Sequence, residues 1–233
     1  MNKAFKFILG VLLLPLCVAA TQSVVALLQL LKPDDVRAVP LAAWWLAGGF
    51  AFWLILFYAL PRPTRTYVLA HELTHAIWGL LMGATISKIK VSKNSGYVSL
   101  SKTNFLIGLA PYFFPFYTMC VILVYFALSF FIDMGRYELF WLAAVGLTWG
   151  FHLTFTIATL MTHQPDITEH GRLFSYTVIY LFNILGIGLW IVAVTPVVLA
   201  AWSESILGES RSAYLAAWQG LEHASATVLA FFR

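Results

Sequence analysis

The stretch YVLAHELTHAIWGLLMG, residues 67–83, decides how the rest of the chain is interpreted. It is apolar enough for a bilayer, yet it carries His71, Glu72 and His75 within about one helical turn. On a helix, positions i and i+4 lie on one face, so both imidazoles can reach one metal ion. Glu72 follows the first histidine, where it can hydrogen-bond a water on that metal. This H-E-x-x-H pattern is typical of a zinc site with a glutamate as general base.

The composition predicts an all-α polytopic membrane protein. Of the 233 residues, 61% are hydrophobic and only 10% are charged, whereas a soluble domain carries about 25% charged residues. Several apolar runs of about 18 or more residues predict about six transmembrane helices. The net charge of +4 is small and dispersed, so we expect the lipid bilayer, and no nucleic acid, as a partner. We therefore expect a single integral-membrane domain over residues 1–233, with its core at 64–190.

The expected helices are separated by prolines and short polar loops. They cover residues 1–31, 41–60, 66–82, 116–132, 137–160 and 173–202. We expect the first to be retained rather than cleaved after residue 20, because its apolar run is longer than that of a signal peptide. Pro111 and Pro115 predict a broken or re-entrant approach to the fourth. Residues 203–233 have the spacing of an amphipathic surface helix.

A short β-hairpin is expected directly after the metal-site helix. Ile89 and Val91 alternate with polar residues, and so do Val98 and Leu100. The turn-forming residues 94–96 lie between these two runs.

A third ligand is needed, because a catalytic zinc usually takes three protein ligands and a water. The candidates are Asp166, His163, Glu169, His170 and His152. Asp166 is attractive because it lies between two spans, where it can be at membrane depth but inside the protein. Asp166 also begins the sequence D-I-T-E, which is typical of a helix N-terminus. The residues alone therefore leave the third ligand open.

Taken together, an HELTH helix, a GYV-containing hairpin, an AP-containing segment and a later aspartate in a polar break resemble the site-2 protease family of intramembrane zinc metalloproteases. The resemblance covers about residues 64–190. It implies that His71, His75 and Asp166 bind Zn²⁺ and that Glu72 activates the zinc-bound water. The implied reaction is hydrolysis of peptide bonds in membrane-embedded substrates.

The same resemblance implies where the substrate binds and where the protein resides. Residues 95–100, with Gly96, Tyr97 and Val98 at their centre, would form the strand that pairs with a transmembrane protein or peptide substrate. The implied location is the cell (inner) membrane.

The chain also departs from the family pattern. The family aspartate usually stands in the setting N-x-x-P-x-x-x-L-D-G, whereas here residues 163–167 read H-Q-P-D-I. No asparagine precedes the proline, so Gln164 or Asn183 would have to replace it. The PDZ-type domain of many relatives does not occur within the sequence. The chain is therefore expected to be a divergent, minimal member.

Two other functions are compatible with these residues. A membrane metallohydrolase of the prenyl-protein protease type also uses H-E-x-x-H but takes a glutamate as third ligand, which here would be Glu169. A catalytically inactive, protease-like membrane scaffold or chaperone would lack a third ligand.

Overall fold

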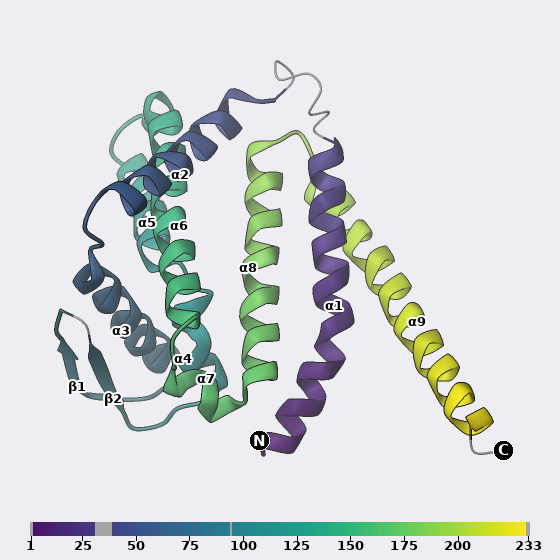
Figure 1. Cartoon of the computed structure of the whole chain (residues 1–233). Coiled ribbons are helices and arrows are strands. Elements are labelled where there is room, and N and C mark those ends of the chain that lie inside the picture. The colour runs from purple at the N-terminus through teal and green to yellow at the C-terminus, as the bar shows by residue number, and fades with distance from the viewer. Residues whose placement is uncertain (1, 31–38, 94, 232–233) are drawn as a thin grey trace. The chain divides into compact units, whose positions relative to one another are not determined.

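The computed structural model describes residues 2–30, 39–93 and 95–231, and this part of the chain is helical apart from one β-hairpin (Figure 1). The elements in chain order are α1 (Lys3–Leu30), α2 (Leu41–Ala59), α3 (Thr64–Leu81), β1 (Ile86–Val91), β2 (Gly96–Leu100), α4 (Phe105–Leu109), the 3-10 helix η2 (Ala110–Tyr112), α5 (Phe116–Ser129), the 3-10 helix η3 (Met134–Tyr137), α6 (Glu138–Leu160), α7 (Pro165–His170), α8 (Arg172–Val194) and α9 (Leu199–Phe231). Both ends of the predicted segment 1–31, residue 94 of the predicted turn and residues 232–233 lie outside the described residues.

The chain divides into two compact units. Unit 1 comprises Met1–Val39 and Gly171–Arg233 and contains α1, α8 and α9. Unit 2 is Pro40–His170 and contains every other element, including the H-E-x-x-H helix and the hairpin. That the two units form a single domain stays a prediction.

In unit 1, α1 packs against both α8 and α9. Val24, Leu27 and Trp202 are buried together, and the Trp202 indole N–H donates a hydrogen bond to Ser23 Oγ at 3.3 Å. The aromatic ring of Trp202 fits there because Gly188 on α8 has no side chain to meet it.

The prediction that the last span runs over residues 173–202 is wrong at its C-terminal end. α8 ends at Val194, and α9 begins only at Leu199. Pro196 has no N–H to continue a helix, and it restricts the residue before it to an extended backbone. Thr195 is accordingly extended, with φ −128° and ψ 165°. The predicted helix over 203–233 is the greater part of α9.

In unit 2, α2 and α6 approach closely because glycines line their contact. A Cβ on Gly49 would overlap the carbonyl oxygen of Ala143, and a Cβ on Gly146 would overlap that of Leu46. Next to these glycines lies a buried cluster of four aromatic rings from the same two helices. They are Trp53, Phe57, Phe151 and Phe155. α2 and α6 are therefore packed closely against each other.

α3 is fixed at both of its ends. Near its start, the ring of Tyr67 stacks on Phe155 of α6, with centroids 4.8 Å apart and planes 9° from parallel. Its last turn is closed by hydrogen bonds from the Gly83 N–H to the Leu80 carbonyl (2.9 Å) and from the Ala84 N–H to Gly79 (2.8 Å). Gly83 has φ +73°, a conformation that favours glycine and commonly ends helices.

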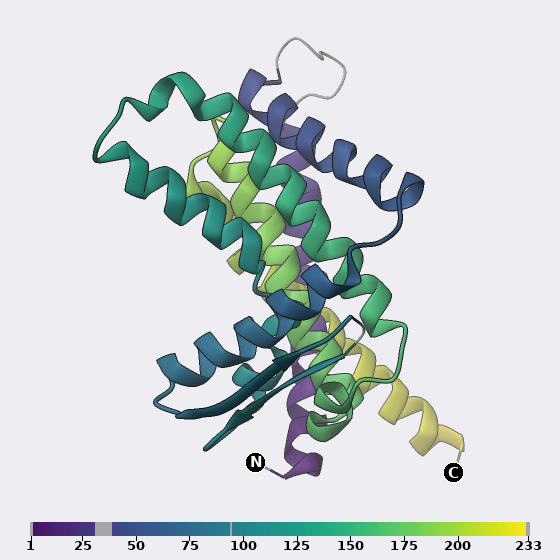
Figure 2. The same ribbon diagram turned by 90° about the vertical axis from the view of Figure 1, so that its left-hand side faces the viewer.

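The predicted β-hairpin is confirmed. β1 and β2 pair antiparallel, with Ile89 opposite Val98 and Val91 opposite Gly96. Side chains alternate between the two faces of a strand, so Gly96, Val98 and Leu100 share the face toward α3. Figure 2 shows the hairpin, α3, α4 and α7 gathered at one end of α6, with the α5–α6 turn at the other.

Within residues 2–30, 39–93 and 95–231, four helices are long and apolar enough to cross a membrane: α1, α2, the segment Met134–Leu160, and α8. A fifth span results if Phe105–Tyr112 and Phe116–Ser129, which meet at 82°, count as one bent crossing. The break contains Pro115, as the prolines predicted. The predicted count of about six included the helix over residues 66–82, but α3 is not among the candidate spans. Long apolar helices of this kind are compatible with a membrane protein.

Polar residues at the centre of α6 face the protein interior. His152 is 7% exposed and Thr156 is 3% exposed. Thr148 receives a hydrogen bond from Thr118 of α5 at 3.1 Å. Further along the helix, Thr159 reaches the wall of a cavity beside α3.

Candidate metal centre

Three side chains that can bind a metal converge in unit 2: His71 and His75 from α3, and Asp166 from the first turn of α7. The Nε2 atoms of the two histidines are 3.2 Å apart. Asp166 Oδ2 lies 3.6 Å from His71 Nε2 and 3.7 Å from His75 Nε2. Within the described ranges, this is the one group of three or more histidine, cysteine or carboxylate side chains close enough to hold an ion.

The spacing of these three atoms suits a tetrahedral ion. Ligand atoms bound at about 2.0–2.1 Å to a tetrahedral metal lie about 3.4 Å from one another, and the observed separations of 3.2–3.7 Å lie on both sides of that value. Two imidazole nitrogens and one carboxylate oxygen form a donor set that catalytic zinc accepts, with the fourth position left for water. The residues present therefore fit the predicted Zn²⁺.

Neighbouring groups orient two of the three ligands. The His75 Nδ1–H donates to the Ile107 carbonyl at 2.8 Å. Since a carbonyl only accepts, Nδ1 carries a proton, and Nε2 is the nitrogen that faces the cluster. The Tyr112 hydroxyl donates to Asp166 Oδ2 at 3.0 Å. The ring of Tyr112 also meets the His71 imidazole edge-on, with centroids 5.3 Å apart. These contacts orient the ligand side chains toward one another.

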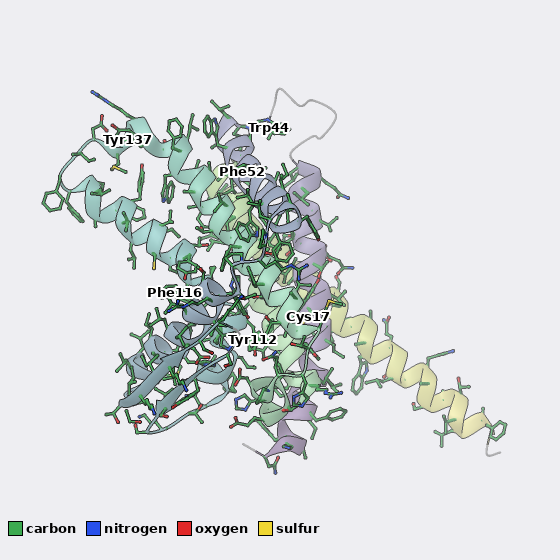
Figure 3. The ribbon with its side chains drawn as sticks, turned by 60° about the vertical axis from the view of Figure 1, so that its left-hand side comes forward. Cys17, Trp44, Phe52, Tyr112, Phe116 and Tyr137 are labelled. Carbon is green, nitrogen blue, oxygen red and sulfur yellow. The ribbon has the colours of Figure 1, made fainter. Side chains whose placement is uncertain are left out.

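Sequence reasoning did not identify Tyr112 or Ile107. Tyr112 is fully buried at the end of η2 and is labelled in Figure 3. A buried tyrosine usually places its hydroxyl against a polar partner, so a tyrosine beside Pro111 in an apolar run was a usable signal. The Ile107 carbonyl had none, because any residue type supplies the same atom.

Glu72 lies under the first residue of β2. Glu72 is buried, with only 6% of its surface exposed. A Cβ on Gly96 would lie 2.6 Å from Glu72 Cγ and 2.7 Å from Oε1. The absence of a side chain at Gly96 is therefore what allows the hairpin to close over the motif glutamate.

The pKa values of the two carboxyl groups of the site, Glu72 and Asp166, are shifted in opposite directions. Burial raises the pKa of Glu72 to about 6; the neighbouring His75 lowers it and the charge of Asp166 raises it further. Burial also acts to raise the pKa of Asp166, but hydrogen bonds and charge interactions with His71 and His75 outweigh it and hold that pKa well below its usual range. Asp166 is consequently ionised, as a ligand must be.

Two cavities meet at this cluster. The larger, about 570 Å³, extends along β2 and α7 and is lined by all three ligand residues and by Gly96, Tyr97 and Val98. The other, about 410 Å³, lies between the start of α3 and the end of α6. His71, Glu72 and Gln164 line both, so space is available on two sides of the motif glutamate.

The other candidate ligands lie outside the cluster. His163 and Glu169 are exposed, although Glu169 lines the larger cavity. His170 is buried against Gly108, where a Cβ would lie 2.7 Å from His170 Nε2. His152 is buried on α6.

The two amides considered as replacements for the family asparagine lie in different units. Gln164 borders both cavities, and its amide donates to Thr162 Oγ1 at 2.8 Å. Asn183 belongs to unit 1 and donates to the Ile179 carbonyl of its own helix at 2.8 Å.

Comparison of the chain with protein-family models, with curated proteins and with solved structures gives no match.

Proposed function

We propose that this chain is an intramembrane zinc metalloprotease of the site-2 protease type, acting on membrane-embedded protein or peptide substrates. One observation carries the proposal. Asp166 is remote in sequence, but its Oδ2 lies 3.6 and 3.7 Å from the Nε2 atoms of the two motif histidines. The cavity at this cluster is also lined by Glu72 and by residues of β2.

Each residue of the site has a role in this proposal. His71, His75 and Asp166 would hold Zn²⁺, which supplies a Lewis acid and lowers the pKa of water toward about 7. Glu72 would accept a proton from the attacking water and deliver it to the leaving amine. The water oxygen bonds to the carbonyl carbon as the C–N bond breaks, and the amine leaves with that proton.

The hairpin would present the substrate. β2 pairs only with β1 among the described residues, so its second edge can accept a further strand. A substrate helix hides its carbonyls in internal hydrogen bonds, whereas a segment added to β2 is held extended. Gly96, Tyr97 and Val98 line the cavity that contains the ligands, which supports their predicted role in substrate binding.

The membrane setting is part of the proposal. We place the chain in the cell (inner) membrane with five spans. Phe105–Tyr112 and Phe116–Ser129, the bent pair, count as one of these spans. α3 and the hairpin lie at one membrane boundary. An even number of crossings then separates α3 from α7, because the bent pair and α6 lie between them. Both halves of the site consequently lie on the same side, as a shared metal requires.

The test is zinc content and hydrolysis of the full-length protein in detergent. Wild type, Glu72→Gln and Asp166→Asn are dialysed against zinc, analysed for bound metal, and assayed with fluorescently labelled casein as an unfolded substrate. We expect about one zinc per chain in wild type and Glu72→Gln, and much less in Asp166→Asn. Hydrolysis should fall by about 10²–10⁴ in Glu72→Gln, because a general base contributes that much.

Other outcomes point to the alternatives. A folded wild type that takes up no zinc would refute the protease and favour the scaffold. Zinc kept by Asp166→Asn but lost by Glu169→Gln would favour the prenyl-protein protease type.

A further inference from the structure

The outward face of the hairpin is strongly basic. Lys88 and Lys90 of β1 lie opposite Ser99 and Tyr97 of β2, on the face turned away from Glu72 and α3. Lys88 Nζ lies 5.8 Å from the centre of the Tyr97 ring, so the two share that face. Two further exposed lysines, Lys93 and Lys102, flank the strands, and Lys102 Nζ lies beside Gly83 at the end of α3. We call Lys88, Lys90 and Tyr97 the basic hairpin face.

No acidic residue of the hairpin balances this charge. Residues 84–104 contain no aspartate or glutamate. Within residues 2–30, 39–93 and 95–231, none of the four lysines makes an ion pair, since the pairs found involve Asp166 and Asp133. The nearest acid along the chain is Glu72, which is buried beneath the opposite face. The lysines are thus available to an external anion.

The basic charge of unit 2 is concentrated at the end that carries the metal centre. Its lysines and arginines are Arg62, Arg65, Lys88, Lys90, Lys93, Lys102 and Arg136. Only Arg136 lies at the other end, beside Tyr137, before α6 begins. Figure 3 shows Tyr137 far from Tyr112, which marks the metal centre. The 23 residues of α6 separate the two ends by about 34 Å, comparable to the hydrocarbon thickness of a bilayer.

Candidate spans enclose the basic hairpin face along the chain. α2 ends at Ala59, three residues before Arg62, and the bent pair begins at Phe105, three residues after Lys102. A segment tied to the membrane on both sides stays near the headgroups. Clustered lysines in such a position are attracted to anionic lipid.

We propose that the basic hairpin face docks on anionic phospholipid headgroups and thereby anchors the strand that lies over Glu72. The inference rests on the membrane location proposed above, but it requires neither zinc nor hydrolysis. The attraction amounts to about fivefold in binding for each lysine near the surface.

The experiment measures how fast one thiol on this face is labelled. Full-length Ser99→Cys, with Cys17 and Cys120 replaced by alanine, is placed in nanodiscs of phosphatidylcholine alone or with about 30% phosphatidylglycerol as the anionic lipid. A small neutral maleimide is the reagent, so its own charge does not bias the result. Tyr137→Cys, at the other end of unit 2, is the matched control.

We expect phosphatidylglycerol to slow labelling of Ser99→Cys by about tenfold or more, since several lysines act together, and to leave Tyr137→Cys unchanged. Salt at about 0.5 M should abolish the protection by screening. Lys88→Gln with Lys90→Gln should weaken docking by about 30-fold. Equal labelling rates in neutral and anionic discs would overturn the proposal.

Two more outcomes would also overturn it. Protection that persists in neutral discs would mean that the face is covered without charge. Protection by polyglutamate peptide in neutral discs, but not by phosphatidylglycerol, would assign the face to an acidic polypeptide. Zinc content and casein hydrolysis, measured on the same samples, test the protease proposal separately.

Discussion

Gly96→Ala tests the contact between the hairpin and the motif glutamate. The new Cβ would lie 2.6 Å from Glu72 Cγ, 2.7 Å from Oε1 and 2.9 Å from Cδ. Carbon atoms in ordinary contact are about 3.5–4.0 Å apart, so either the glutamate or the strand must move by roughly 1 Å. Cγ cannot swing aside as freely as a side-chain terminus, and Glu72 is buried.

The expected cost follows from this displacement. Overpacking a buried contact destabilises a protein by about 1–3 kcal/mol. The ligand triad does not include Glu72, so zinc content should stay at the wild-type level. If the proposed protease activity holds, moving the base by about 1 Å should lower hydrolysis by about 100-fold.

The assay is a stability cycle of Gly96→Ala, Glu72→Ala and the double variant, followed by thermal unfolding in detergent. Alanine has no Cγ, so the double variant should recover about 1 kcal/mol or more relative to the sum of the single changes. Gly48→Ala is the matched control, because nothing lies within 4 Å of its Cβ. Additive effects, or a fully stable Gly96→Ala, would refute the reasoning.

Three further results are expected. Tyr112→Phe removes the hydrogen bond to Asp166 and should weaken zinc affinity by about 10–100-fold in a competition titration; unchanged affinity would remove Tyr112 from the site. Zinc at about 100 times its Kd should stabilise wild type by about 2.7 kcal/mol, so removing it with a chelator should lower the stability measured in melting curves by that amount. Asp166→Asn should be unaffected. An equal loss of stability in both proteins would indicate zinc bound elsewhere. Gly49→Ala places a methyl group against the Ala143 carbonyl and should lower the stability of the protein by about 1–3 kcal/mol or more. A melting temperature like that of Gly48→Ala would contradict the α2–α6 packing.

Local sequence signals predicted most of the secondary structure. The predicted spans 41–60 and 137–160 match α2 and α6 within one residue at either end, because long apolar runs bounded by proline or polar loops leave little choice of helix limits. The β-hairpin followed from alternation at period two. The last span was predicted too long because apolar residues continue past Pro196, while a helix needs the N–H that proline lacks.

The sequence by itself determined the H-E-x-x-H pair of histidines, since i and i+4 on one helix must share a face. It left Asp166 as one of five candidates, because side chains from separate elements meet only through tertiary packing. The fold brings Asp166 to the histidines, aims it with the Tyr112 hydroxyl, and closes Gly96 over Glu72. Each of these contacts joins segments far apart in the chain, and no local spacing or propensity specifies them.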